Sequence, residues 1–174
     1  MNILENTASI ELIIAVIIGL LTVYLTKVLI MNYYLKKTNE SNPYENLSFM
    51  IFLSGSIFSV SYIVFGIMEP LSASIKILGV SNLTNLDLSL EIVKYLAMFL
   101  VFGYTFSAII IYTSFKLFSI LTDKVDEYDE ISKNNIGVAL LISVLLIVIA
   151  MFAKNPFIVF VESFIPYPDL PSIF

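Results

Sequence analysis

Long apolar runs alternate with short polar stretches along the chain, and this alternation is the main structural signal in the sequence. Helices of about 20 apolar residues cross the roughly 30 Å of hydrocarbon in a bilayer. None of the runs alternates apolar and polar residues strictly, which excludes a barrel of transmembrane strands. The pattern therefore predicts an all-α membrane protein with four transmembrane helices, at about residues 12–35, 47–68, 95–121 and 136–153.

The four spans form two helical hairpins in tandem, the first in residues 1–90 with an outer loop and the second in residues 91–174 with a C-terminal tail. Both halves contain a lysine within a long helix, then a charged loop, an asparagine and an apolar helix. We therefore predict a parallel repeat of two hairpins, with four unrelated spans as the alternative. A shift of 89 residues superposes Lys27 on Lys116, Asn46 on Asn135 and Ser54 on Ser143.

Lysine placement predicts how the spans are oriented. Six lysines lie in or beside the loops 36–46 and 122–134, whereas the opposite side holds only Lys76, Lys94 and Lys154. Because loops rich in lysine stay in the cytoplasm, both termini are expected on the extracytoplasmic side. The spans and their lysines therefore predict a multi-pass membrane protein with the loops 36–46 and 122–134 in the cytoplasm.

Two helix starts carry capping signals. Asn42 is expected to cap the second span, with Pro43 in the first helical position and Glu45 reaching back as in a capping box. In the acidic loop before the fourth span, Ser132 is the expected cap.

The segments on the opposite side are harder to interpret. The outer loop is expected to be solvated, with residues 71–78 as a candidate interfacial helix. Lys154, Asn155 and Pro156 predict the end of the fourth span. Residues 156–165 then suggest a short C-terminal interfacial or re-entrant helix, with a kinked continuation of the fourth span as the alternative.

Composition narrows the chemistry. Hydrophobic residues make up 59% of the 174 residues and charged residues 13%, whereas soluble domains carry about 25% charged residues. The apolar excess requires the lipid bilayer as a partner. Histidine and cysteine are both absent, which removes disulfides, the usual zinc sites and imidazole catalysis. No basic patch suggests nucleic-acid binding. Since no nucleotide-binding loop, Ser–His–Asp set or metal-ligand cluster is present either, we expect a protein that is not an enzyme and has no cofactor or metal.

The candidate functional residues are polar groups at the membrane boundary. Asn46 and Asn135 stand at the starts of the second and fourth spans, where a bare amide needs hydrogen-bond partners. They either tie helices together or line a polar vestibule. Lys27 and Lys116 lie about two turns from a cytoplasmic helix end, where they either extend to the headgroups or bind lipid phosphate or an anion.

Small residues define helix-packing faces on the second and fourth spans. Small side chains let helices approach closely, and serine hydroxyls bond carbonyls or neighbouring helices. A hydroxyl-lined pore is the alternative to packing. The packing faces contain Gly55, Ser59 and Gly66 on the second span and Ala139 and Ala150 on the fourth. Ser54 and Ser143 belong with Asn46 and Asn135 as polar groups that either bond between helices or line a vestibule.

The segments ENLSFMIFLSG at 45–55 and EISKNNIGVALLIS at 130–143 both open a return helix with asparagine and small residues. In this the chain resembles the bacterial family called domain of unknown function 350. The resemblance implies a four-helix inner-membrane protein whose members often have no assigned biochemistry.

Two functions remain open on the sequence. The first is a non-enzymatic oligomeric scaffold or accessory subunit of an envelope complex, whose partners are copies of itself or other membrane proteins. The second is a small ion or solute channel or transporter, lined by the Asn and Ser faces of the two hairpins.

Overall fold

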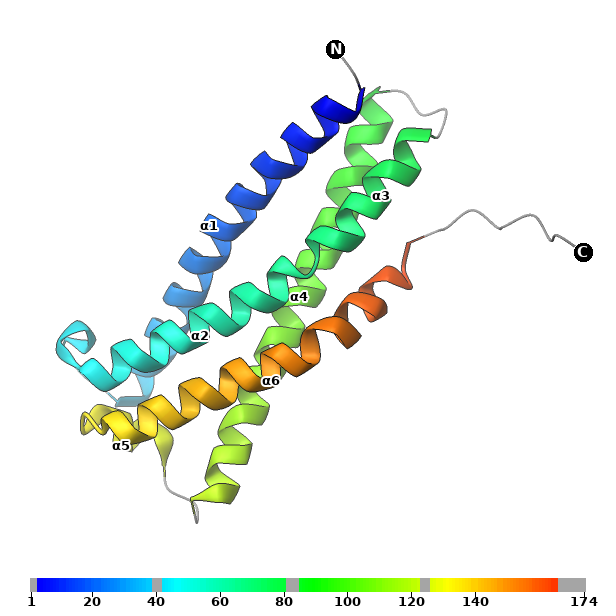
Figure 1. Cartoon of the computed structure of the whole chain (residues 1–174). Helices are drawn as coiled ribbons and strands as arrows, with labels where there is room; N and C mark the ends of the chain where they lie inside the picture. The colour runs from blue at the N-terminus through cyan, green and yellow to red at the C-terminus, as the bar shows by residue number, and fades with distance from the viewer. Residues whose placement is uncertain (1–2, 39–41, 81–84, 123–125, 166–174) are drawn as a thin grey trace, which may run out of the picture.

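The computed structural model describes residues 3–38, 42–80, 85–122 and 126–165, and within these ranges the chain is helical with no strand (Figure 1). Four helical segments are long and apolar enough to cross a membrane, which confirms the all-α, four-span prediction. The elements are α1 (Ile3–Thr38), η1 (Pro43–Glu45), α2 (Leu47–Phe65), α3 (Met68–Val80), α4 (Asn85–Leu121), α5 (Glu127–Ser132) and α6 (Ile136–Glu162).

The long helices alternate in direction. α1 and α4 run toward one end of the bundle, and α2 and α6 return from it side by side (Figure 1). We call this end, which holds Asn46 and Asn135, the asparagine end. α1 packs on α2, whereas α4 packs on both α2 and α6. The division into hairpins 1–90 and 91–174 and their repeat stay predictions, but α2 and α6 share one core.

The contact between α2 and α6 depends on small residues. A Cβ added to Gly55 would lie 2.5 Å from the Cβ of Ser143, so the two backbones approach too closely for a larger residue. The Ser143 hydroxyl donates to the Ala139 carbonyl at 2.8 Å and also lies 3.1 Å from the carbonyl oxygen of Ile51. Close approach of this kind gives helices van der Waals contact that lipid does not supply.

The helices extend further than predicted at the end opposite the asparagine end. α4 begins at Asn85 instead of about residue 95. The outer loop is largely helix, because α3 follows α2 after a turn at Gly66 and Ile67 and buries Leu71 against the bundle. This amphipathic helix is longer than the interfacial helix considered for residues 71–78.

The predicted break of the fourth span at Pro156 does not occur, because α6 continues to Glu162. Proline removes one helical hydrogen bond, to the carbonyl of Phe152. Packing compensates, since the buried Phe157 ring stacks on Phe106 with centroids 4.9 Å apart. Residues 156–162 therefore continue the fourth span and do not form a separate helix, while residues 166–174 lie outside the described part of the chain.

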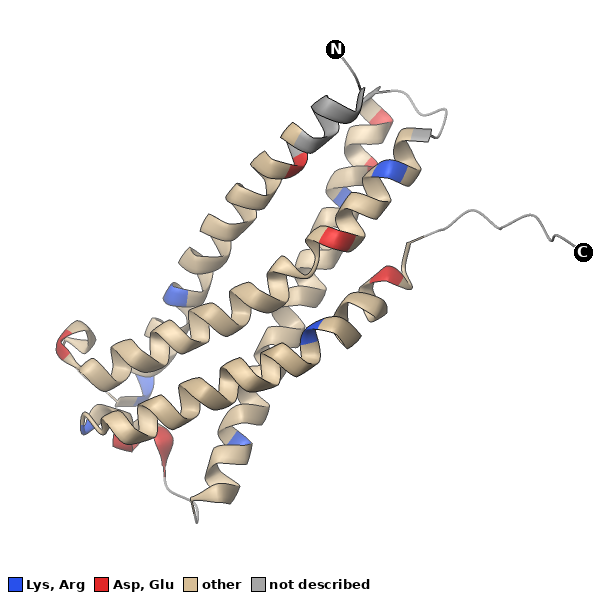
Figure 2. Cartoon of the chain, in the orientation of Figure 1, with Lys and Arg blue, Asp and Glu red and all other residues tan. Residues whose placement is uncertain are grey.

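Charged residues are sparse where the helices cross the apolar zone. The first 18 residues of α6, up to Lys154, carry no charge, and neither does α2 (Figure 2). The large exposed side chains along these helices are instead apolar, for example Leu20 on α1 and Phe152 on α6. Such an apolar outer surface matches a lipid environment.

Candidate functional site

The start of α2 depends on Asn46, which is 5% exposed. Its Oδ1 accepts a hydrogen bond from the Phe49 backbone N–H at 3.0 Å, which satisfies one of the free donors of a helix start. Its Nδ2 donates to the Ile131 carbonyl at 2.8 Å, in α5 of the other hairpin. One amide therefore caps its own helix and joins the two hairpins.

The expected cap at Asn42 is wrong for α2. Asn42 precedes the short η1 turn, makes no side-chain hydrogen bond to that turn's backbone, and donates instead to the Glu45 carboxylate at 2.7 Å. Ser132 is likewise not the cap of α6, because it lies in the last turn of α5 and donates to the Asp129 carbonyl. The η1 turn separates Asn42 from α2, and a turn at Lys133 and Asn134 separates Ser132 from α6.

Asn134 is the residue that the sequence analysis missed. Its φ of 60° is in the left-handed region, which glycine adopts most readily and asparagine next. The Asn135 N–H bonds the Glu130 carbonyl and the Asn134 N–H bonds the Ile131 carbonyl, which is a Schellman motif ending α5. In this position the Asn134 Oδ1 accepts from the Ser48 N–H at 3.0 Å.

Two asparagines from different hairpins therefore cap the same helix start. Asn46 binds the N–H of Phe49 and Asn134 binds the N–H of Ser48. We call Asn46, Asn134 and Asn135 together the asparagine junction. The sequence feature that could have indicated the role of Asn134 is the Asn134–Asn135 pair. A tight connection between two helices needs one residue that ends the first helix and one that caps the second, and asparagine suits both positions.

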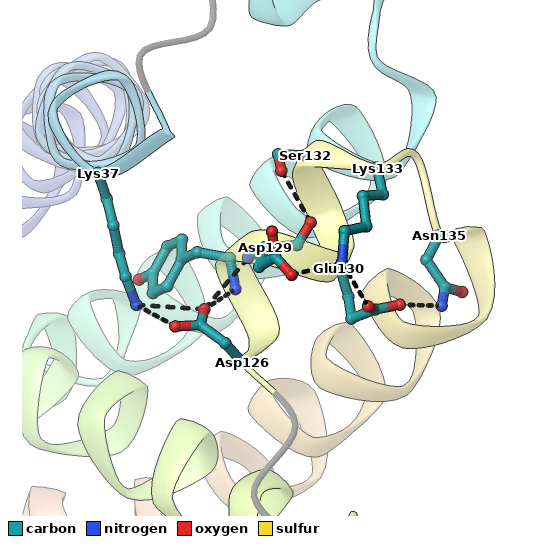
Figure 3. Close-up of polar contacts among 8 residues, drawn as sticks. Lys37, Asp126, Asp129, Glu130, Ser132, Lys133 and Asn135 are labelled. Atoms are coloured by element: carbon teal, nitrogen blue, oxygen red, sulfur yellow. Dashed lines mark hydrogen bonds and ion pairs between the residues drawn. The ribbon is translucent and has the colours of Figure 1, made fainter.

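Asn135 begins α6 with the same geometry that Asn46 uses for α2. Its Oδ1 accepts from the Val138 N–H at 3.3 Å, and its Nδ2 donates to the Glu130 carboxylate at 2.7 Å (Figure 3). The amides at this boundary thus have partners within the fold.

α5 is fixed at its start by Asp126. The carboxylate accepts from the backbone N–H groups of Tyr128 and Asp129 at 3.0 and 3.1 Å, and it pairs with Lys37 of α1 at 3.3 Å (Figure 3). Partial burial raises the pKa of this carboxyl, but the Asp129 N–H, Lys37 and the Tyr128 N–H together outweigh burial and hold it below its usual value. Lys37 also lies over the Tyr128 ring, 4.4 Å from its centroid.

Tyr128 anchors α5 in an aromatic cluster. Its ring lies 4.9 Å from that of Phe115 on α4 and 6.2 Å from that of Phe52 on α2, measured between centroids. Burial raises the pKa of the Tyr128 phenol well above its usual range, with the charges of neighbouring residues adding to the effect. Beside it, Ile131 is fully buried.

The outer face of α5 is charged. Asp126 and Asp129 expose 53% and 57% of their side chains, and Lys133 bridges Asp129 and Glu130 at the end of the helix (Figure 3). The hydrogen bond to the Asp129 carboxylate raises the pKa of the Lys133 ammonium. Asp123 and Lys124 of the same loop lie outside the described residues.

The other predicted residues are dispersed. Lys27 and Lys116 are exposed, and the Lys27 ammonium lies 5.5 Å from the ring centroid of Tyr44, which places it beside η1. Ser54 points outward and donates to the Met50 carbonyl. The others form the buried helix contacts: Gly55, Ser59, Ala139, Ser143 and Ala150 where α2 and α6 pack, and Gly66 next to Ile158.

Within the described part of the chain, no group of three or more acidic side chains is arranged to hold a metal ion. A family model described as Domain of Unknown Function (DUF350) matches residues 3–155, which is most of the chain and confirms the resemblance seen in the sequence. No curated protein and no solved structure matches the chain.

Proposed function

The chain belongs to the DUF350 family, and from its geometry we propose that it is a non-enzymatic membrane subunit that docks a partner protein on α5. It acts as an oligomeric scaffold or accessory subunit of an envelope complex. The observation that carries this proposal is a six-residue helix held rigidly on the bundle with its carboxylates directed outward.

A helix as short as α5 does not persist in water by itself. Here Asp126 caps it, Tyr128 and Ile131 bury its inner face, and Asn134 ends it. The carboxylates of Asp126 and Asp129 therefore occupy fixed positions instead of sampling many. A surface that is ordered before binding loses less entropy when a partner binds.

The side of the membrane follows from charge. Lys27, Lys36, Lys37, Lys116 and Lys133 all lie near the asparagine end in sequence and in the helical path. The positive-inside rule then assigns α5 to the cytoplasmic side of the inner membrane and both termini to the other side. The partner is accordingly a protein with a basic surface that reaches the cytoplasmic headgroups.

The test is site-specific photocrosslinking in cells from position 133, the exposed residue that follows α5, so that the carboxylates of Asp126 and Asp129 stay in place. We expect one discrete adduct, lost when Glu127→Gln and Asp126→Asn remove charge, since asparagine still caps α5. Crosslinking from position 116, exposed on α4, is the matched control. A monomer that gives no adduct from position 133 would exclude the docking role.

A channel is the competing function, and flux measurements separate the two. Several polar groups considered as its lining donate instead to backbone carbonyls inside the fold, as Asn46, Ser59 and Ser143 do. We expect liposomes with dense protein to stay tight to ions and small solutes. A leak that depends on Asn46 or Asn135, with assembly intact, would favour the channel.

A further inference from the structure

A cavity of about 170 Å³ lies between the first and second spans, in the half of the bundle away from the asparagine end. Most of its wall is apolar, and Gly19, which is exposed, lies at its rim with open space where a Cβ would be. The lining residues are Ala15, Ile18, Gly19 and Thr22 of α1, and Ser61, Val64, Phe65 and Met68 of α2 and α3.

The size and lining suit hydrocarbon better than water. An apolar cavity of about 150 Å³ stays dry and binds benzene, whereas a buried water needs two to four polar partners. Two hydroxyls line this cavity: Thr22 bonds the Tyr104 hydroxyl at 3.1 Å, and Ser61, whose Oγ has no partner among the described residues, is a single polar group where a water needs at least two. The cavity also lies in segments of α1 and α2 that are long and apolar enough to cross the membrane, where the surrounding solvent is acyl chain.

A lysine lies next to this cavity. The Lys154 ammonium of α6 is 4.7 Å from the Tyr62 ring centroid and 5.1 Å from that of Phe65, and the Phe65 side chain also lines the cavity. Within the described ranges, no carboxylate lies within ion-pair distance of Lys154, unlike Lys37, Lys94 and Lys133.

The depth of Lys154 matches a headgroup. It follows Asn135 by nineteen residues of continuous helix, which at 1.5 Å per residue is about 28 Å. That is close to one hydrocarbon thickness, so the ammonium lies at the boundary opposite the asparagine end. Phe65 follows Asn46 by the same number of residues and lies at the same level, so a lipid with its headgroup here would extend a chain past Phe65 toward Ser61 and Thr22, the deeper part of the cavity.

We propose that this cavity binds one acyl chain of an anionic glycerophospholipid whose phosphate pairs with Lys154. The aromatic rings of Tyr62 and Phe65 hold the ammonium in place while its N–H donors remain for the phosphate. The apolar wall takes the chain, and charge complementarity selects an anionic headgroup. This site is independent of the docking surface on α5.

The chain-binding part is tested by native mass spectrometry of the purified protein titrated with phosphatidylglycerol. Gly19→Leu fills the cavity, and we expect it to weaken binding about tenfold or more, because each excluded methylene carries a share of the transfer free energy. Gly79→Leu is the matched control, since a Cβ there also meets nothing within 4 Å. Equal binding by both variants and the unmodified chain would overturn the proposal.

The headgroup part is tested with Lys154→Gln, using Lys76→Gln, an exposed lysine on α3, as the control. We expect Lys154→Gln to lower affinity for phosphatidylglycerol about tenfold, as loss of a charge-assisted contact does. Phosphatidylcholine carries the same phosphate with a compensating positive charge, so its binding should be weaker from the start and should fall less on the substitution. Equal affinity of the unmodified chain for both lipids would refute the role of Lys154. If Gly19→Leu instead turns a dimer into a monomer with lipid binding unchanged, a second copy occupies the cavity and the proposal fails.

Discussion

Asn134→Gly removes the hydrogen bond between the Asn134 side chain and the start of α2 while keeping the backbone relaxed, and the bond from Asn46 to Ile131 remains. Glycine adopts the φ of 60° without cost, so the main loss is the acceptor for the Ser48 N–H at 3.0 Å. An orphaned buried donor costs about 1–3 kcal/mol. Since this helix start lies near the membrane boundary, where water can partly replace the acceptor, we expect the lower end, about 1 kcal/mol.

Asn134→Ala adds a second penalty. Alanine in the left-handed region costs about 1–2 kcal/mol more, so the free energy of unfolding should fall by about 2–3 kcal/mol in total. The order of stability is then the unmodified chain, Asn134→Gly and Asn134→Ala. Unfolding in detergent micelles, measured for all three chains under one condition, gives these differences.

Hydrogen exchange identifies which bond was lost. In Asn134→Gly the Ser48 amide should exchange about fivefold faster, as a loss of about 1 kcal/mol implies. The Phe49 amide, held by Asn46, should change less. If Asn134→Gly is as stable as the unmodified chain, or if the glycine and alanine variants lose the same amount, the assigned roles of Asn134 are wrong.

Three further predictions test other contacts. Gly55→Ala should lower the free energy of unfolding by about 1–3 kcal/mol through overpacking, measured by thermal unfolding, and Ser143→Gly should partly rescue it. Gly103→Ala is the control and should be near neutral, because the nearest atom to its Cβ would be 3.5 Å away, and equal effects at the two glycines would contradict the close helix contact. Asn46→Asp keeps the cap but turns a carboxylate toward the carbonyls of α5, and it should destabilise more than Asn46→Ser, with the opposite order in the same unfolding assay counting against the bridging role. The pKa of Asp126 is lowered in the folded chain, so its stabilisation of α5 is present above the ordinary carboxyl pKa of about 3.9 and is lost as pH falls through the lowered value. Hydrogen exchange of the first amides of α5 should become faster in that pH range, and Asp126→Asn should abolish this pH dependence.

The sequence by itself determined the spans. The predicted starts at residues 47 and 136 and the predicted end at residue 121 agree with α2, α6 and α4. These are local properties, because a run of apolar residues long enough to cross hydrocarbon has to be helical there, whatever its neighbours are. The absence of histidine and cysteine was equally plain in the sequence.

Tertiary contacts decided the rest. α6 passes through Pro156 because Phe157 and Val161 are buried against the bundle. The sequence suggested a helix at residues 71–78, but only the structure shows that α3 is longer and packs Leu71 and Ile75 on the core instead of lying at the interface.

The asparagine junction was likewise predicted only in part. The sequence placed Asn46 and Asn135 at the starts of the two return helices, but it assigned the caps to Asn42 and Ser132, three or four residues too early. It did not show that Asn134 caps α2 from 86 residues away, or that Asn46 bonds Ile131. Those bonds exist only once α2 and α6 pack side by side, and the small residues at Gly55 and Ser143 set how closely they pack.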